Sequence, residues 1–214
     1  MSRTDADFIA AGVTIVKERG FAQLTSRSLG DAMGIHSTAV YRHFPQWDLL
    51  VLAVTDAIFG ESAARHLPEI LAVADPRARV LTLMRIVRAE IDLNPELAAN
   101  LVRMAGSPVS VATPHADAMA GLVVDALLEM GVPSDSVAIA YQALENFTMG
   151  GAALDYAGLP DHLSKRLGRR RMAGIPAFTQ VAKSPDDIER INAQAFTLGA
   201  DALLDACEKL AAAP

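Results

Sequence analysis

The sequence predicts an all-α protein, with an N-terminal three-helix helix-turn-helix domain followed by a C-terminal helical bundle. Hydrophobic residues make up 51% of the 214 residues, but aromatic residues only 5%. The apolar content is therefore mostly alanine, leucine, valine, isoleucine and methionine, which favours the packing of helices over that of sheets. Helical spacing recurs along the chain, and no segment shows the alternation of a strand.

Two short helices are predicted at the start of the chain. Apolar residues at helical spacing define the first, and Gly20 is a suitable cap for its C-terminus. The Thr25 side chain can cap a second helix over residues 26–33, which Gly34 ends.

A third short helix is predicted to open at His36 or Ser37 and to extend to His43 or Phe44. Pro45 prevents a smooth continuation, because its ring fits only the first turn of a helix. Three short helices with a glycine-containing turn between the last two are the layout of a DNA-reading unit.

Prolines mark helix starts in the rest of the chain, since proline is tolerated in a first turn. A long helix begins around residues 46–48 and runs into the sixties. Further helices are predicted at 76–93, 95–105, 114–130, 134–157 and from residue 185 or 186 to 212. The segment 158–185 holds three prolines, three glycines and a basic run, and it is predicted to be a long connection.

The helix-turn-helix is expected to have an apolar seam and a polar face. The seam consists of the following residues: Leu29, Met33, Ile35, Val40 and Phe44, directed towards Phe8, Ile15 and Leu24. The opposite face of the third helix carries Ser37, Thr38, Tyr41 and Arg42, at steps of three and four. These residue types donate hydrogen bonds to phosphates and base edges, as a helix in a major groove must do.

Residues 24–50 carry a more specific pattern. It consists of a Leu-Thr opening, a Gly-Ile turn, a Val-Tyr-Arg-His-Phe ending and a later Leu-Leu pair, at Leu24-Thr25, Gly34-Ile35, residues 40–44 and Leu49-Leu50. This pattern resembles the DNA-binding domain of the TetR family of transcriptional repressors.

The resemblance implies a set of DNA contacts. Arg27 would reach a base, and Tyr41 and His43 would hold the DNA backbone. The complete set is Thr25, Ser26, Arg27, Ser37, Thr38, Ala39, Tyr41, Arg42 and His43. Other readings stay open: Thr25 as a cap alone, Arg27 as a solvated side chain, and Tyr41 as an aromatic at the edge of the core. The chain departs from the family at residues 45–48, where a lysine that often precedes the Leu-Leu pair is missing.

The net charge of −6 is distributed unevenly. Residues 1–55 hold five basic and five acidic side chains, so the whole deficit lies in residues 56–214. A neutral module can still bind DNA if its cations share one face. The run Lys165-Arg166 and Arg169-Arg170-Arg171 is conspicuous in the acidic part; it fits either a solvated loop or a contact with an anionic effector or a partner subunit.

The last two long helices carry apolar stripes with small residues among them, which suits a tightly packed four-helix interface. The stripes are Val137, Tyr141, Leu144, Thr148, Gly151 and Leu154, and Ile188, Ile191, Ala195, Leu198, Ala202, Ala206 and Leu210. The segments 147–151 and 196–201 also resemble the dimer helices of the tetracycline-repressor branch. We therefore expect a homodimer through these helices, with an intramolecular core as the alternative.

A small-molecule effector, largely apolar, is expected in a pocket of the C-terminal part. The candidate lining residues are Met84, Arg88, Asn100, Met104, His115, Gln142 and Asn146. The five histidines show no paired ligand spacing, so we expect no metal site within the protein and no cofactor.

Several classes are disfavoured. We expect no membrane span, no secretion signal and, with Cys207 as the single cysteine, a cytoplasmic protein without internal disulfides. A redox role for Cys207 would need an exposed thiol of low pKa. No catalytic motif appears, so an enzyme is not expected.

The expected function is a ligand-responsive repressor that binds palindromic operator DNA as a homodimer and is released by its effector. The DNA-binding domain would cover residues 1–47, and the ligand-sensing and dimerisation domain residues 48–214. The alternatives are a ligand-responsive activator and a helical dimeric adaptor without a DNA function.

Overall fold

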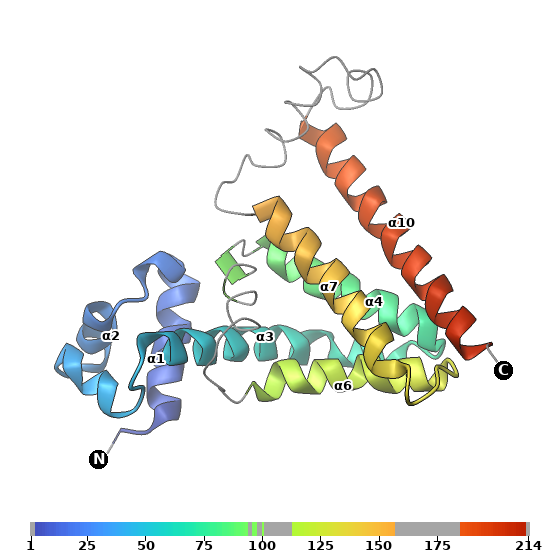
Figure 1. Cartoon of the computed structure of the whole chain (residues 1–214). Coiled ribbons are helices and arrows are strands. Elements are labelled where there is room, and N and C mark those ends of the chain that lie inside the picture. Colours follow the sequence, from blue (N-terminus) through green and yellow to red (C-terminus); the bar gives the residue numbers. More distant parts are fainter. Residues whose placement is uncertain (1–2, 94–95, 98–99, 101–112, 157–184, 213–214) are drawn as a thin grey trace. The chain divides into compact units, whose positions relative to one another are not determined.

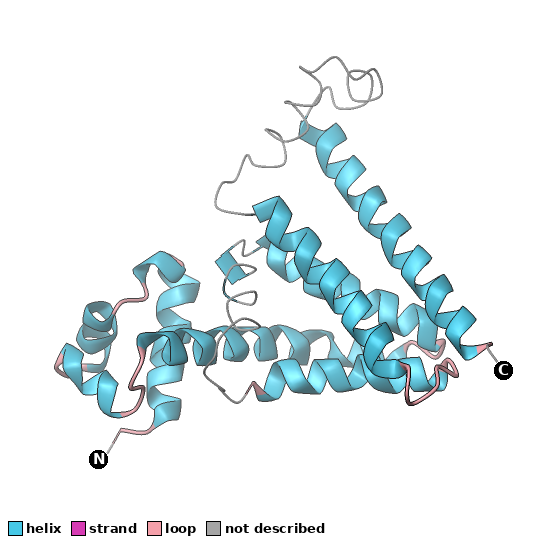
Figure 2. Ribbon diagram, viewed as in Figure 1, coloured by secondary structure: helices cyan, strands magenta, loops and turns pink. Residues whose placement is uncertain are grey.

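The computed structural model describes residues 3–93, 96–97, 100, 113–156 and 185–212. These residues form helices and no strand, which confirms the all-α class (Figure 2). The α-helices, as labelled in Figure 1, are α1 (Asp5–Arg19), α2 (Ser26–Met33), α3 (Trp47–Ala72), α4 (Pro76–Leu93), α6 (Pro114–Glu129), α7 (Val137–Tyr156) and α10 (Pro185–Ala211). Two short 3₁₀ helices lie among the first of these: η1 (Phe21–Gln23) and η2 (Ser37–Arg42). None of the helices in these ranges is both long and apolar enough to cross a membrane.

Local capping chemistry sets the limits of the first helices. At the start of α2, the Thr25 side chain accepts a hydrogen bond from the Ser28 backbone N–H, and the Ser28 hydroxyl accepts one from the Thr25 N–H. Such a reciprocal capping box satisfies two backbone donors that the helix leaves free. Gly34 ends α2 in the left-handed conformation, at φ 63° and ψ 39°, which glycine adopts without steric cost. Both predicted caps of α2, Thr25 and Gly34, are confirmed.

Three helices differ from the expectation. The segment Ser37–Arg42 is a 3₁₀ helix, because its bonds link residues three apart, such as the Ala39 N–H to the His36 carbonyl. Helix α3 continues through Pro68, beyond the predicted end in the sixties, and α7 begins at Val137, three residues later than predicted. Most of the predicted helix 95–105, the connection 158–185 and the basic run at 165–171 lie outside the described residues.

The chain divides into two compact units. The first comprises Met1–Pro68 with Asn100–Ala120, and the second comprises Glu69–Ala99 with Gly121–Pro214. This division by contacts is not a division by function, so the boundary at residue 47 stays a prediction.

One hydrophobic core holds the helices of the first unit together. Its buried residues are Phe8, Val13, Ile15, Val16, Leu24, Leu29, Met33, Val40, Phe44, Leu50, Val51, Val54 and Ile58. The predicted seam is thereby confirmed, with Ile35 half-buried against the core. Helix η2 packs on α2 at Gly30, where an added Cβ would lie 2.9 Å from the Ile35 carbonyl oxygen and 3.1 Å from the Ser37 Cα. A glycine is needed there because the turn and η2 approach the α2 backbone directly.

In the second unit α4, α7 and α10 pack against one another. The rings of Phe147 on α7 and Phe196 on α10 stack with centroids 5.6 Å apart. A Cβ on Gly199 would lie 2.3 Å from the Phe147 ring, so this glycine makes room for the aromatic side chain. Of the small residues predicted to allow close packing, Gly199 thus accommodates a ring of α7 within the same chain, whereas an added Cβ on Gly150 would meet nothing within 4 Å.

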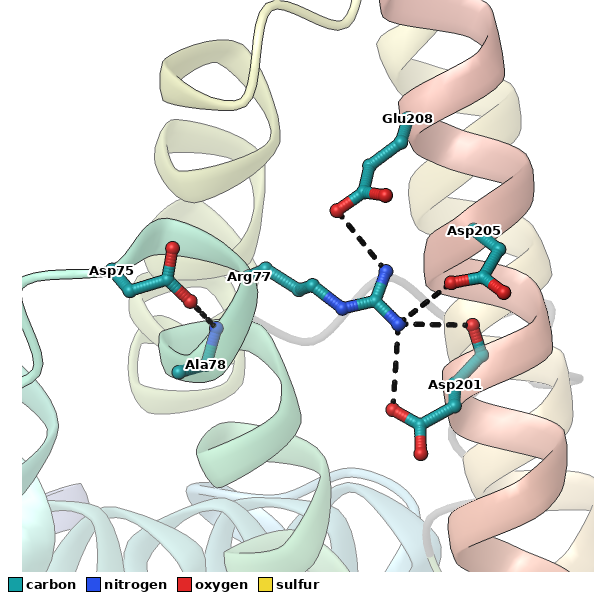
Figure 3. Close-up of polar contacts among 6 residues, drawn as sticks. All are labelled: Asp75, Arg77, Ala78, Asp201, Asp205 and Glu208. Carbon is teal, nitrogen blue, oxygen red and sulfur yellow. Dashed lines mark hydrogen bonds and ion pairs between the residues drawn. The ribbon is translucent and has the colours of Figure 1, made fainter.

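An ion-pair cluster joins the start of α4 to the C-terminal half of α10 (Figure 3). The Arg77 guanidinium lies 2.8 Å from Asp205, 3.2 Å from Glu208 and 3.4 Å from Asp201. Burial lowers the pKa of Arg77, but the hydrogen bond and charge of Asp205 and Glu208 outweigh burial and raise it above its ordinary value. Arg77 therefore stays charged and fastens α10 to α4.

Candidate DNA-binding surface

Helix η2 presents three of its five predicted DNA-contacting side chains to solvent. Thr38, Tyr41 and Arg42 are exposed, while Ser37 and Ala39 are half-buried. Val40 on the opposite side is 2% exposed and anchors η2 in the core. In a 3₁₀ helix residues three apart lie one above the other, so Thr38 and Tyr41 share one row.

The start of α2 supplies the other predicted contacts. Arg27 is exposed, Ser26 is half-buried, and the Thr25 hydroxyl is committed to the capping box although its side chain is exposed. Thr25 is thus a helix cap in this structure. Its contact with phosphate, like those of Ser26 and Arg27, stays a prediction.

His36 is engaged locally, at the turn before η2. Its Nδ1 accepts a hydrogen bond from the Thr38 backbone N–H and lies 2.9 Å from the Thr38 hydroxyl. The side chain therefore caps η2.

His43 is bound by a residue that sequence reasoning missed. Its Nδ1 lies 2.7 Å from Oδ1 of Asp5, the first residue of α1. Arg3, just before α1, donates to the carbonyl of Met33 at the end of α2 over 2.7 Å. Partners separated by 38 and 30 positions leave no signal in a local pattern.

Acidic and basic groups lie close together around the start of α1. The pKa of Asp7 is lowered, first by the hydrogen bond from the Thr4 backbone N–H, then by the one from the Thr4 hydroxyl, with smaller contributions from the charges of Arg3 and His43. Asp7 is therefore ionised at neutral pH, and it holds the N-terminal cap of α1.

The predicted phosphate contact at the start of α3 has no basic side chain in this sequence. Trp47 is the first residue of α3, and it packs half-buried against the core of the first unit. A contact through backbone N–H groups there stays a prediction.

The two predicted assembly stripes differ in exposure. On α7, Leu144 and Thr148 are 2% and 5% exposed and belong to the interior of the second unit. On α10, Leu198 is 74% exposed, and Ala202 and Leu210 are exposed as well. Two residues of the α7 stripe are therefore intramolecular core, whereas the described part of the α10 stripe presents an exposed apolar row.

The predicted effector-pocket residues fall into different surroundings. Met84 and Arg88 are buried in the second unit, and the Arg88 guanidinium lies 5.8 Å from the Phe196 ring centroid. Gln142 and Asn146 are exposed on α7, where the Gln142 amide donates to Asn146.

Two of the remaining pocket candidates, Asn100 and His115, belong to the first unit. Asn100 is 5% exposed, His115 is exposed, and Met104 lies outside the described residues. Asp56 on α3 was missed: its carboxylate, 3% exposed, accepts hydrogen bonds from the backbone N–H groups of His115 and Ala116 at the start of α6. The signal that could have found it is an acid within the largely apolar stretch of α3 at residues 49–60. Membership of a common pocket stays a prediction.

Cys207 is 3% exposed, and burial raises the pKa of its thiol. The exposed thiol of low pKa that a redox role requires is therefore not present at this position.

No family model matches the chain. Among curated proteins, an HTH-type transcriptional regulator of Saccharopolyspora erythraea is 28% identical over 182 residues, which cover 82% of this chain and 73% of the relative. The tetracycline repressor protein class G of Vibrio anguillarum is 36% identical over 61 residues, 28% of this chain and 29% of the repressor.

Solved structures match nearly the whole chain. A putative transcriptional regulator from Streptomyces coelicolor A3(2) has a TM-score of 0.73 and 23% identity, with 100% of both chains covered. The structure of BioQ with its double-stranded DNA operator has a TM-score of 0.60 and 18% identity, with 97% of this chain and 99% of BioQ covered. A TetR variant from Acinetobacter baumannii in complex with minocycline has a TM-score of 0.61 and 18% identity, with 98% of both chains covered.

The architecture is thus that of a two-part helical protein with an N-terminal helix-turn-helix. The chain has the fold of the TetR-family transcriptional regulators, and the resemblance predicted from residues 24–50 is confirmed.

Proposed function

We propose that the protein is a transcriptional repressor of the TetR type, acting in the cytoplasm. It binds palindromic operator DNA as a homodimer and is released by a small-molecule effector. The observation that carries this proposal is the exposed row of hydrogen-bonding side chains on η2, held by a buried Val40 and a capped α2. The operator complex of BioQ and the minocycline complex of TetR support a DNA partner and a small-molecule partner, respectively.

The residues have distinct roles in this mechanism. Arg27 carries a fork of donors that suits the N7 and O6 atoms of guanine. Thr38 and Tyr41 lie side by side on η2 and reach a base edge and a phosphate. One short helix reads too few base pairs, so two copies bind half-sites about 34–36 Å apart.

Release requires that the effector binds the DNA-free state better than the DNA-bound state, since a ligand with equal affinity for both shifts nothing. Helix α3 runs from the first unit into the second and is the element through which the signal passes. The exposed stripe on α10 supplies the dimer contact. Activation in place of repression would use the same contacts and differ only in the position of the operator.

The test is fluorescence anisotropy with labelled duplex fragments from the promoter upstream of the protein's own gene. Arg27→Ala is expected to weaken binding about 10- to 100-fold, which corresponds to the loss of one bidentate base contact. Tyr41→Phe is expected to weaken it about fivefold, the effect of one hydrogen bond. Undiminished binding by both variants would contradict the contact assignment.

A matched control is Arg19→Ala at the C-terminal end of α1, another exposed arginine of the first unit. It removes the same charge from outside the proposed surface, so it should weaken binding less than Arg27→Ala does. If the wild-type protein binds no fragment at any salt concentration, the adaptor without a DNA function becomes the better description.

A further inference from the structure

The imidazole ring of His43 is held in place by α1. Its Nδ1 lies 2.7 Å from the Asp5 carboxylate, and its ring centroid lies 4.7 Å from that of Phe8, which is 1% exposed. The backbone at Asp5 is fixed, because the capping box of Thr4 and Asp7 sets the start of α1. The side chain of His43 remains 27% exposed. The ring is therefore oriented by its contacts with α1, while its exposed part remains accessible to a binding partner.

The hydrogen-bonding pattern restricts what His43 can bind. An ionised carboxylate only accepts hydrogen bonds, so Nδ1 facing Asp5 carries a hydrogen. A neutral ring has one N–H, so in the neutral form Nε2 carries none. A DNA phosphate is also an acceptor only. Contact between Nε2 and a phosphate therefore forms only when the ring is protonated on both nitrogens.

We propose that Asp5 is a positioning residue for DNA binding: it orients His43 and provides the counter-charge for an imidazolium whose Nε2–H binds a backbone phosphate. Binding of the operator then takes up one proton per protomer at His43. This inference rests on the proposed function and adds to it a residue of α1 that is not among the predicted DNA contacts, together with a dependence on pH. Asp5 touches no DNA in this arrangement and acts through His43.

Other charged residues lie near His43, either at the start of α1 or next to it in the chain. Asp7 lies in the same turn of α1 as Asp5, Arg3 precedes that turn, and Arg42 precedes His43 in the chain. Aspartate and arginine side chains ordinarily keep their charges between about pH 6 and pH 8, whereas histidine ordinarily changes its charge there. A pH dependence of binding in this interval therefore reports on histidine.

The test uses a labelled duplex that the wild-type protein has selected from a random-sequence library. Its affinity is measured by anisotropy at about pH 6, 7 and 8 and at several salt concentrations. The wild-type affinity is expected to fall about tenfold from pH 6 to pH 8, the effect of one charge-assisted contact. The slope of log K against log salt should be steeper at pH 6 by about 0.9 per protomer, because one more phosphate is neutralised.

Two variants separate the roles. Asp5→Asn keeps an oxygen that accepts from Nδ1 but removes the counter-charge, so the pH dependence should shift to lower pH. His43→Gln should abolish it. Removing the acid also strengthens the general attraction to DNA equally at every pH, so the pH profile is the readout and not the affinity alone.

Asp31→Asn is the matched control, since Asp31 is an exposed acid on α2 in the same unit. It should change affinity by the same factor at each pH and leave the profile unchanged. The inference is overturned if Asp5→Asn behaves like Asp31→Asn, or if the wild-type affinity is independent of pH. A wild-type protein that selects no duplex would overturn the proposed function instead, and circular dichroism checks that each variant is folded.

Discussion

Helix η2 and helix α10 both present an exposed row of side chains, but the rows differ in chemistry. On η2 the exposed residues are Thr38, Tyr41 and Arg42, which donate hydrogen bonds. On α10 the exposed residues of the row include Leu198, Ala202, Ala206 and Leu210, which are apolar. Each row is backed by buried residues of its own unit, so the exposed side is not needed for local packing.

The difference indicates two kinds of partner. Exposed donors at the tip of a helix-turn-helix suit phosphates and base edges, which compete with water for hydrogen bonds. An exposed aliphatic row on a 27-residue helix suits another protein surface, and we propose that a second copy of α10 covers it. The comparison can be tested by altering each row, or its support, in turn.

The largest effect is expected for Leu198→Glu on α10. A charge in the centre of the apolar row would be buried without a partner in the dimer, so the dissociation constant of the dimer should rise about 100-fold or more. Analytical ultracentrifugation measures this as a shift to monomer. Leu128→Glu is the control, because Leu128 is an exposed leucine on α6, outside the two predicted interface helices. Equal behaviour of the two variants would contradict the assignment of the α10 row.

A smaller effect is expected for Gly30→Ala, which alters the support of η2. The added methyl group would meet backbone atoms of Ile35 and Ser37, which cannot move independently of the turn. We expect the free energy of unfolding of the first unit to fall by about 1–3 kcal/mol.

Trp47, the single tryptophan, packs against the core of that unit, so its fluorescence during urea unfolding reports the change. Gly121→Ala on α6 is the control: nothing lies within 4 Å of its added Cβ, and it should be neutral or stabilising. If the Gly30→Ala protein is as stable as wild type, the backbone at Ile35 and Ser37 can shift to accommodate the added methyl group.

The smallest effect is expected for Asp7→Asn at the cap of α1. The pKa of Asp7 is lowered in the folded protein, so its carboxylate contributes stability above the ordinary pKa of 3.8, and this contribution is lost as pH falls through the lowered value. The variant should therefore be less stable than wild type at pH 7 and equal to it at about pH 2. Unfolding followed by Trp47 fluorescence at both pH values checks this, and a difference that persists in acid would point to packing in place of charge.

Sequence reasoning found the features that depend on neighbouring residues. The caps Thr25 and Gly34 and the apolar seam of the helix-turn-helix follow from spacing and residue type, and the structure has them. The 3₁₀ character of residues 37–42 was missed, because α and 3₁₀ helices differ by a shift of one residue in their hydrogen bonds, which hardly changes the apolar pattern.

Contacts between distant segments could not be predicted in this way. The pairing of Asp5 with His43 joins residues 38 positions apart, and that of Asp56 with the N–H of Ala116 joins residues 60 apart. Neither acid belongs to a motif, and each has a role only through the tertiary fold. The local pattern thus predicted residues of η2 that are exposed, such as Thr38 and Tyr41, but not the distant acids that hold neighbouring groups in place.

The hydrogen bonds between Asp56 and the start of α6 have a consequence for how this protein tolerates substitution. The carboxylate binds main-chain N–H groups, which every residue except proline possesses. These two hydrogen bonds therefore do not depend on which side chains stand at positions 115 and 116, provided that neither residue becomes proline. Position 56 has no such freedom, because only an acid of the same length places two acceptor oxygens there. Within this contact, the acceptor depends on the identity of one side chain, whereas the donors belong to the main chain and do not.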